Sequence, residues 1–268
     1  MSVSDRLFEL IRANEPVALA TVVEGPGLGG HLLIVPGSDS EGSLGDPDLD
    51  RVVHRDGLAE LEAGRSGVRT YGPHGETTPE DLADTPQVRI FVESWAPPPQ
   101  MWIFGAVDFT AALARVAKVL GYRVMVCDAR EIFATGRRFP MADEVRVSWP
   151  GPLFAERGEE LGSRDVVCIL THDAKFDVPA VQGALRTAVG YIGVMGSRRT
   201  HERRLERLAD AGVTDQADLG RLMSPIGLDL GARTPEETAI SICAEIIAAR
   251  TGRAAQSLRD ASGPIHPG

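Results

Sequence analysis

Residues 196–199 read Gly-Ser-Arg-Arg and follow directly on the apolar run YIGVM. A glycine-serine turn that opens a helix offers backbone N–H groups and a hydroxyl to an anion. The guanidinium groups of Arg198 and Arg199 add positive charge and paired donors that match phosphate oxygens. We therefore predict that Gly196, Ser197, Arg198 and Arg199 bind an anion. The alternative is an ordinary capped helix with a solvated basic face, which would continue through Arg203, Arg204 and Arg207.

His172 and Asp173 raise the question of acid–base chemistry. They follow Thr171 and the apolar run DVVCIL. A carboxylate can orient an imidazole ring and raise its pKa, which suits a general base. Neighbouring residues of an extended chain point to opposite sides, however, so we favour loop hydrogen bonding for this pair over a catalytic dyad. We assign no catalytic residue.

Gly105, Asp108 and Asp128 lie where dinucleotide-binding domains carry their fingerprint. Gly105 follows the apolar run MWIF, and Asp128 comes about twenty residues later, where such folds hold a ribose hydroxyl. The chain lacks the second and third glycines of G-x-G-x-x-G. Asp108, which could cap the next helix, would also repel a phosphate. NAD and NADP are therefore disfavoured as cofactors, while Asp128 and Arg130 stay candidate binding residues at this strand end.

These chemical groups follow predicted strands. Residues 101–104, 122–126, 165–170 and 191–195 are apolar runs with the length of buried strands. Helical periodicity over 110–120, ended by Gly121, joins the first two runs into a βαβ unit. Crossover helices make such strands parallel, so the segments after them should meet at the carboxyl edge of one sheet. Those segments are residues 105–108, 128–130, 171–175 and 196–199.

The last predicted helices have clear signals. A helix should begin near Arg199, and Thr234, Pro235 and Glu237 predict the capping box of another, which should end at Gly252. We predict an α/β fold with a Rossmann-like, mostly parallel sheet in the C-terminal domain and a smaller α+β N-terminal domain.

The N-terminal part mixes helical and strand patterns. Residues 4–12 and 50–63 are predicted helices, and residues 36–48 a loop. Strands are predicted at 17–24, 31–35, 68–71 and 88–93, the first two as a hairpin and the last two joined by TTPEDLADTP. Residues 94–100, SWAPPPQ, read as a proline-rich linker. The domains are then residues 1–93 and 101–253, followed by a flexible tail at 254–268.

The composition and charge of the chain argue against several classes of function. The 268 residues carry a net charge of −10, which argues against nucleic acid as a partner. No apolar run approaches the length of a membrane span, and the N-terminus lacks a signal-peptide pattern, so we expect a cytoplasmic protein. Cys127, Cys168 and Cys243 lie inside apolar runs without metal-ligand spacing, which favours core packing and no metal site. The chain also lacks the nucleophile-elbow, Walker and H-E-x-x-H motifs.

A set of segments resembles the C-terminal domain of the XdhC/CoxI family, the xanthine dehydrogenase accessory factors. In order along residues 100–252 these segments are IFGAVDFTAALARVAKVLGYRVMVCDAR, RFPMADEV, LTHDAKFDVPA, YIGVMGSRR and PIGLDLGARTPEETAISICAEIIA. The N-terminal half is also similar to the family. GPGLGG, residues 25–30, stands where the family tends to have glycine-serine-x-proline-arginine, and GSLGDPDLD, residues 42–50, stands where it has a glycine-rich segment with a cysteine, which is absent here. The resemblance implies that both segments lie near the pyranopterin.

The resemblance implies a maturation factor for molybdenum hydroxylases such as xanthine or carbon monoxide dehydrogenase. Such a factor binds the molybdenum cofactor transiently and delivers it, in sulfurated form, to the hydroxylase apoenzyme. The resemblance also implies a sulfurtransferase partner and a homodimer. We accordingly expect a cofactor-binding chaperone, with the cofactor held by the turn at 196–199 and a crevice lined by Asp128 and His172.

Two other hypotheses remain open from the sequence. The first is an NAD(P)-dependent oxidoreductase, which Asp128 favours and Asp108 opposes. The second is a ligand-free adaptor or regulatory paralogue, which would bind a partner protein and leave the crevice filled by side chains such as Val107.

Overall fold

The computed structural model describes residues 2–77 and 86–261. The chain divides into two compact units, Met1–Pro97 and Pro98–Gly268, which are described separately. Most of the predicted connector TTPEDLADTP and residues 262–268 of the predicted tail lie outside the described residues. No described helix is long and apolar enough to cross a bilayer.

The first unit is an antiparallel sheet of strand order β3-β2-β1-β5-β4. Strands β1 and β2 form the predicted hairpin, with Ala18 opposite Ile34. Val53 and Leu61 of α2 pack with Ala18, Val22 and Ile90 of the sheet, whereas α1 joins a smaller cluster through Leu7 and Leu10. The elements are α1 Val3–Arg12, β1 Val17–Glu24, β2 His31–Ile34, β3 Glu41–Ser43, α2 Pro47–Ala63, β4 Gly67–Tyr71 and β5 Val88–Trp95.

The loop prediction for residues 36–48 is wrong in two places. Strand β3 lies within it, where His31 pairs with Ser43. Helix α2 begins at Pro47, because the Asp46 carboxylate accepts hydrogen bonds from Asp48 N and Leu49 N. A three-residue edge strand has too short a pattern to be recognised without its partner.

The proline-rich segment between the units is shorter than predicted from composition. Ser94 and Trp95 belong to β5, and Gln100 begins β6. Only residues 96–99 lie between these strands.

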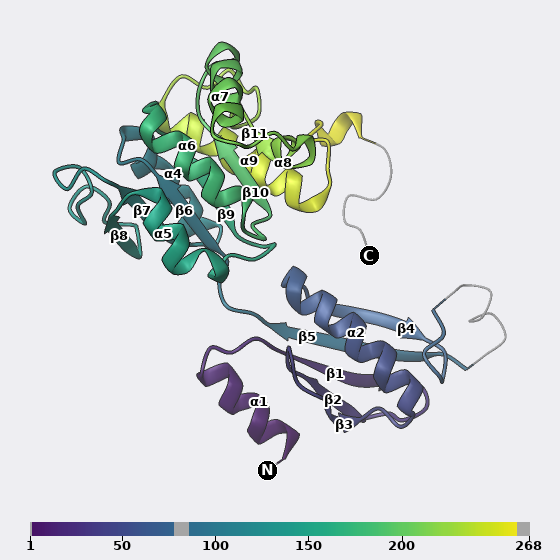
Figure 1. Cartoon of the computed structure of the whole chain (residues 1–268). Helices are drawn as coiled ribbons and strands as arrows, with labels where there is room; N and C mark the ends of the chain where they lie inside the picture. Colours follow the sequence, from purple (N-terminus) through teal and green to yellow (C-terminus); the bar gives the residue numbers. More distant parts are fainter. Residues whose placement is uncertain (1, 78–85, 262–268) are drawn as a thin grey trace. The chain divides into compact units, whose positions relative to one another are not determined.

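The second unit contains a six-stranded sheet of order β11-β10-β9-β6-β7-β8, in which all neighbouring strands are parallel (Figure 1). Numbered from β6, this is the Rossmann order 3-2-1-4-5-6. The order reverses between β6 and β9. The elements are β6 Gln100–Phe104, α4 Asp108–Val119, β7 Arg123–Asp128, β8 Glu144–Val147, α5 Pro150–Arg157, η1 Gly158–Glu160, β9 Val166–Ile169, α6 Ala174–Leu185, β10 Tyr191–Val194, α7 Arg198–Asp210, α8 Gln216–Gly220, β11 Leu222–Met223, α9 Pro235–Thr251 and η2 Leu258–Asp260.

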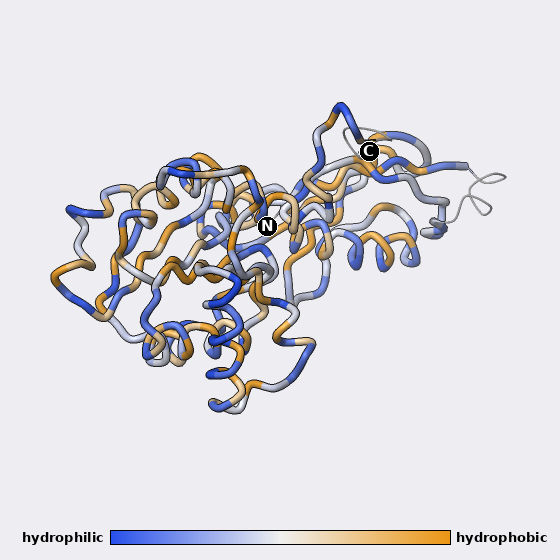
Figure 2. The backbone as a smooth tube through the Cα atoms, turned by 90° about the horizontal axis from the view of Figure 1, so that it is seen from above, coloured by the Kyte–Doolittle hydropathy of each residue, from blue (hydrophilic) through white to orange (hydrophobic). Residues whose placement is uncertain are grey.

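Alternate side chains of the central strand enter two hydrophobic cores. Met101 and Ile103 of β6 pack in the cluster that contains residues of α4 and α9. Trp102 and Phe104 pack on the other face with residues of α5, α6 and α7. The sheet is thus covered by helices on both sides, as a parallel sheet requires. These helices bury only the side that faces the sheet, and in Figure 2 hydrophilic and hydrophobic colours accordingly alternate along the helical turns.

The fold class and the capping box were predicted well. Thr234 and Glu237 exchange the expected hydrogen bonds, and Gly252 ends α9 in a left-handed conformation. Strands β8 and β11 and helices α5 and α8 were not predicted. Their sequences are short, and the strand conformation of β8 and β11 depends on pairing with β7 and β10.

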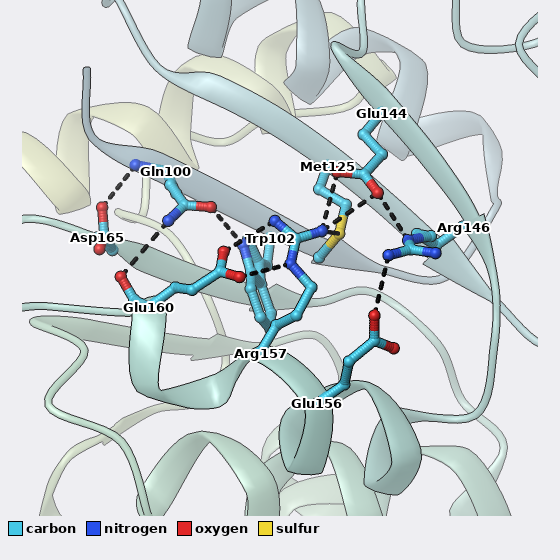
Figure 3. A network of polar contacts seen from close by, with 9 residues as sticks. All are labelled: Gln100, Trp102, Met125, Glu144, Arg146, Glu156, Arg157, Glu160 and Asp165. Atoms are coloured by element: carbon cyan, nitrogen blue, oxygen red, sulfur yellow. Dashed lines mark hydrogen bonds and ion pairs between the residues drawn. The ribbon is translucent and has the colours of Figure 1, made fainter. Parts of the chain in front are cut away.

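A polar network ties α5 to the sheet (Figure 3). Arg157 donates to both carboxylate oxygens of Glu144 on β8, at 3.0 and 3.2 Å, and to Glu160 at 2.8 and 2.9 Å. Its guanidinium group lies 5.8 Å from the Trp102 ring centroid. The network fixes one end of α5 and therefore the path of the chain into β9.

Candidate functional site

The carboxyl edge of the parallel sheet brings together the segments that the sequence singled out. In the order β10-β9-β6-β7, each strand is hydrogen-bonded to the next. Neighbouring strands lie about 4.8 Å apart, so the residues after them form one continuous rim. The reversal of strand order between β6 and β9 is where ligands bind in such folds.

Gly105 forms the turn between β6 and α4. Its φ of +112° is one that residues with a Cβ avoid, and a Cβ here would lie 2.5 Å from Thr171 Cγ2. Gly105 N donates to the Cys127 carbonyl at 2.8 Å. The glycine therefore serves close packing of the ends of β6 and β9.

Asp128 is buried at the end of β7, and its carboxylate is engaged by the protein itself. Oδ2 accepts from Ala106 N at 2.7 Å and from Arg130 Nη2 at 2.8 Å, while Oδ1 accepts from Arg130 N and Nε. Burial acts to raise the pKa of Asp128, but the hydrogen bonds from Arg130 and Ala106 outweigh it and hold the pKa below its usual value. A ribose hydroxyl would have to displace these bonds, so the geometry disfavours dinucleotide binding through Asp128.

Asp108 is not the N-cap that the sequence suggested. Val107 occupies that position without a side-chain bond, and Asp108 is the first helical residue, with its side chain 91% exposed. Val107 packs at the edge of the α4 core. Arg138, which sequence reasoning missed, lies 3.8 Å from Asp108 and donates to the Ala106 carbonyl at 3.3 Å. The turn after β6 is thus held from both sides by Asp128 and Arg138.

His172 and Asp173 are both exposed at the end of β9. The Asp173 carboxylate accepts from Lys175 N at 3.0 Å and caps α6. This carboxylate therefore stabilises the helix start.

The turn at 196–199 connects β10 to α7. Gly196 has a φ of +142°, and Ser197 is the N-cap, with its hydroxyl accepting from Thr200 N at 3.1 Å. Arg198 and Arg199 are exposed, and within residues 2–77 and 86–261 neither guanidinium group has an ion pair or hydrogen bond. The serine hydroxyl is thus used by the helix, whereas the guanidinium groups face solvent and can bind an anion.

A buried ionic network underlies this turn. Arg204, only 2% exposed, lies 3.5 Å from the buried Asp177 carboxylate and donates to the Met195 carbonyl at 2.7 Å and to Ser224 Oγ at 3.1 Å. Thr171 Oγ1 donates to Asp177. Burial raises the pKa of Asp177 to about 7, although the Arg204 charge opposes it. The assignment of Arg204 to a solvated face is therefore wrong, because α7 turns this residue toward β10 and α6.

Sequence reasoning also missed Asp177 and Trp149. Asp177 shares a face of α6 with the buried residues Ala180, Val181 and Ala184, and a charge inside an apolar stripe is a usable signal of a buried ion pair. Trp149 follows β8, which was not recognised. Trp149 is 51% exposed at the carboxyl edge.

The three cysteines are buried. Burial raises the pKa of Cys127 to about 12 and that of Cys243 to about 11, so neither forms a thiolate near neutral pH. No cluster of His, Cys, Asp or Glu able to hold a metal ion occurs in the part of the chain that the structure describes.

In the first unit, the two glycine-containing segments lie side by side. A Cβ at Gly27 would approach the Leu44 carbonyl oxygen to 2.3 Å, and a Cβ at Gly30 would lie 3.1 Å from that of Ser43. Leu44 N donates to Asp50 Oδ1 at 2.7 Å. Segments 25–30 and 42–50 therefore form one surface next to the start of α2.

Both units of the chain match models of known protein families. Residues 101–246 match the model of the XdhC Rossmann domain, and residues 10–72 match that of the XdhC and CoxI family. The chain belongs to the XdhC and CoxI family. The resemblance noted in the sequence is thereby confirmed, as is the Rossmann-like fold of the second unit.

Several relatives are similar to this XdhC-family chain. A protein of Bacillus subtilis named as a probable xanthine dehydrogenase subunit is 30% identical over 60% of this chain and 46% of its own length. "Molybdenum cofactor insertion chaperone PaoD" of Escherichia coli is 29% identical over 36% of this chain and 30% of its own length. The chain spans less than half the length of these curated relatives. A crystal structure of a xanthine dehydrogenase from Bacillus halodurans shares the fold, with a TM-score of 0.52, 20% identity, and 96% and 98% of the two chains covered.

Proposed function

We propose that this chain is a cytoplasmic accessory factor in the maturation of a molybdenum hydroxylase, and that its second unit holds the molybdenum cofactor for delivery. Membership of the XdhC and CoxI family supports the maturation role, and so does the similarity to a protein named as a molybdenum cofactor insertion chaperone. The partners proposed are a sulfurtransferase, a second copy of this chain and the hydroxylase apoenzyme.

The binding proposal rests on the guanidinium groups of Arg198 and Arg199, which have no ion pair or hydrogen bond to any residue that the structure describes. Arg198 and Arg199 stand at the start of α7, at the carboxyl edge, where α7 follows β10, the strand beside β9. A phosphate there gains charge-assisted hydrogen bonds and the favourable end of the helix dipole.

The residues of the rim fit an anionic cofactor that carries a planar ring. In the proposal, Arg198 and Arg199 hold the phosphate, with Gly196 and Ser197 shaping the turn. Arg130, His172 and Asp173 line the remainder, together with the structural residues Gly105, Asp108 and Asp128. The bound group would supply the molybdenum chemistry. The buried cysteines supply no accessible thiol, so sulfur would come from the partner enzyme.

Binding of purified molybdenum cofactor to this protein tests the proposal. The double variant Arg198→Ala with Arg199→Ala should bind about 10- to 100-fold more weakly, since hydrogen bonds to charged groups contribute about 1.5–3 kcal/mol. Arg203→Ala with Arg207→Ala is the matched control. Both residues are exposed on the same helix, and the two substitutions remove the same amount of positive charge. Reconstitution of an apo-hydroxylase by the loaded protein is the second readout.

An equal loss of cofactor affinity in both double variants would show that the net charge of the helix is responsible, and would reject the turn at 196–199 as the binding site. Absence of cofactor binding at micromolar wild-type protein would reject the carrier role. Heat released on titration with NAD or NADP would instead revive the oxidoreductase hypothesis.

A further inference from the structure

Aromatic rings form a continuous chain from the core of the second unit to its carboxyl edge. Trp102 contacts Phe154 with centroids 5.5 Å apart, and Phe154 stacks on Phe104 at 5.1 Å. Phe104 contacts Phe176 at 6.2 Å, and Phe176 contacts Trp149 at 5.9 Å. Trp102, Phe104 and Phe176 are buried, whereas Trp149 is 51% exposed. The chain of rings therefore ends in a supported indole that is open to solvent.

Trp149 lies on the rim described above. It is the N-cap of α5, two residues after the end of β8, and the preceding Ser148 N donates to the Asp128 carbonyl at 3.2 Å. Its ring leans onto Phe176 in the first turn of α6, the helix that Asp173 caps. Trp149 thus connects the end of β8 with the first turn of the helix that follows β9.

We propose that the exposed face of Trp149 is a stacking platform for a fused planar heterocycle, with the attached phosphate directed to residues 198 and 199. This inference rests on the proposed function and deepens it. It assigns the ring of the ligand to a residue outside the turn that holds the anion. The chemistry is shared by a pterin phosphate and by a purine nucleotide.

The geometry of the helices supports this assignment. Helices α6 and α7 are in contact, and packed helices lie about 8–10 Å apart. Asp177 in the first turn of α6, next to Phe176, lies 3.5 Å from Arg204 in the second turn of α7, so the starts of these two helices are neighbours. A ligand whose ring stacks on Trp149 and whose phosphate lies at the start of α7 would cross the first turn of α6. Phe176 fixes the indole from behind, so stacking costs little additional side-chain entropy.

Calorimetric titration of the full chain with 6-hydroxymethylpterin phosphate, GMP and inorganic phosphate tests the platform. Trp149→Ala should weaken binding of at least one ring compound by about tenfold or more, the size expected for loss of one stacking contact. Trp149→Phe should stay within a few-fold of wild type, because it retains a ring. Inorganic phosphate should bind equally to all variants. Ile132→Ala is the matched control, since this side chain is 78% exposed after β7 and outside the ring chain.

Fluorescence gives an independent readout. A stacked ring should quench the Trp149 emission of wild type, and this quenching should be absent in Trp149→Phe, where Trp95 and Trp102 remain. If Trp149→Ala does not fold, Trp149→Leu keeps the packing on Phe176 and removes only the aromatic face.

Equal affinity of wild type and the Ala or Leu variant for the ring compounds would overturn the platform. So would failure of wild type to bind either ring compound at millimolar concentration. In both cases cofactor binding by wild type, measured separately, still decides the proposed function.

Discussion

At the scale of single residues, the Asp177–Arg204 pair decides how the rim is held. Arg204 contacts α6 through Asp177, the end of β10 through the Met195 carbonyl, and the end of β11 through Ser224. Thr171, just after β9, donates a hydrogen bond to Asp177 and so connects the end of β9 to this pair. A buried pair is expensive to desolvate and contributes positioning more reliably than net stability.

Arg204→Met should lower the free energy of unfolding by about 3–5 kcal/mol, because it leaves the Asp177 carboxylate buried without its cation. Adding Asp177→Leu to this variant should recover much of the loss. Urea denaturation at pH 8 measures both effects. A single variant within about 1 kcal/mol of wild type would show that the pair is not stabilising the fold.

The pH dependence of stability should also report on Asp177. Its pKa of about 7 in the folded chain lies above its ordinary value of 3.8, so the folded state binds this proton more tightly. Unfolding then releases a proton between these pH values, and stability falls as pH rises through the window. In Asp177→Asn this contribution, on the order of 1 kcal/mol per pH unit, should disappear. Urea midpoints of both proteins from pH 4.5 to 8 measure it, and parallel curves would refute it.

At the scale of elements, the turn between β6 and α4 joins neighbouring strand ends. Gly105 allows Thr171 to approach, while Asp128 and Arg138 bind the N–H and carbonyl of Ala106. Side chains from β7 and from the segment before β8 therefore hold this turn.

Gly105→Ala should destabilise the protein by about 2–4 kcal/mol, from the strain of a positive φ and from overlap with Thr171. Gly121→Ala is the matched control, because its φ is +81° and its Cβ would meet nothing within 4 Å. It should cost about 1–2 kcal/mol. Adding Thr171→Ser to Gly105→Ala removes the clashing methyl and should recover part of the difference. Equal thermal midpoints for the two alanine variants would contradict the proposed close approach.

At the scale of the whole molecule, each unit has its own cores. Residues 7–92 supply the two clusters of the first unit, and residues 101–246 supply those of the second. The proposed platform at Trp149 and the proposed anion-binding turn at residues 198 and 199 both belong to the second unit. The glycine-containing surface at 25–30 and 42–50 belongs to the first.

We predict that the 28.7 kDa chain is a homodimer, as its family membership suggested from the sequence. Sedimentation equilibrium at micromolar concentration should give about twice the chain mass. A mass of one chain at every concentration up to about 100 μM would contradict the prediction, because a stable dimer interface gives at least micromolar affinity.

The sequence by itself determined the elements whose signals are local. Apolar runs located β6, β7, β9 and β10, periodicity located α4, and the capping box at Thr234 located the start of α9. The parallel order of the strands followed from their helical crossovers, and so did the meeting of their carboxyl ends. Each of these features depends on residues close together in the chain.

Only the tertiary structure decided which of the candidate side chains are available. Asp128, expected to line the crevice, is occupied by Ala106 and Arg130. Arg204, which the alternative to anion binding placed on a solvated face, is buried against Asp177. Strand β8 forms by pairing with β7, and it brings Trp149 to the rim. The physical reason is that burial and hydrogen bonding are decided by partners distant in sequence, whereas a local pattern contains only its own residues.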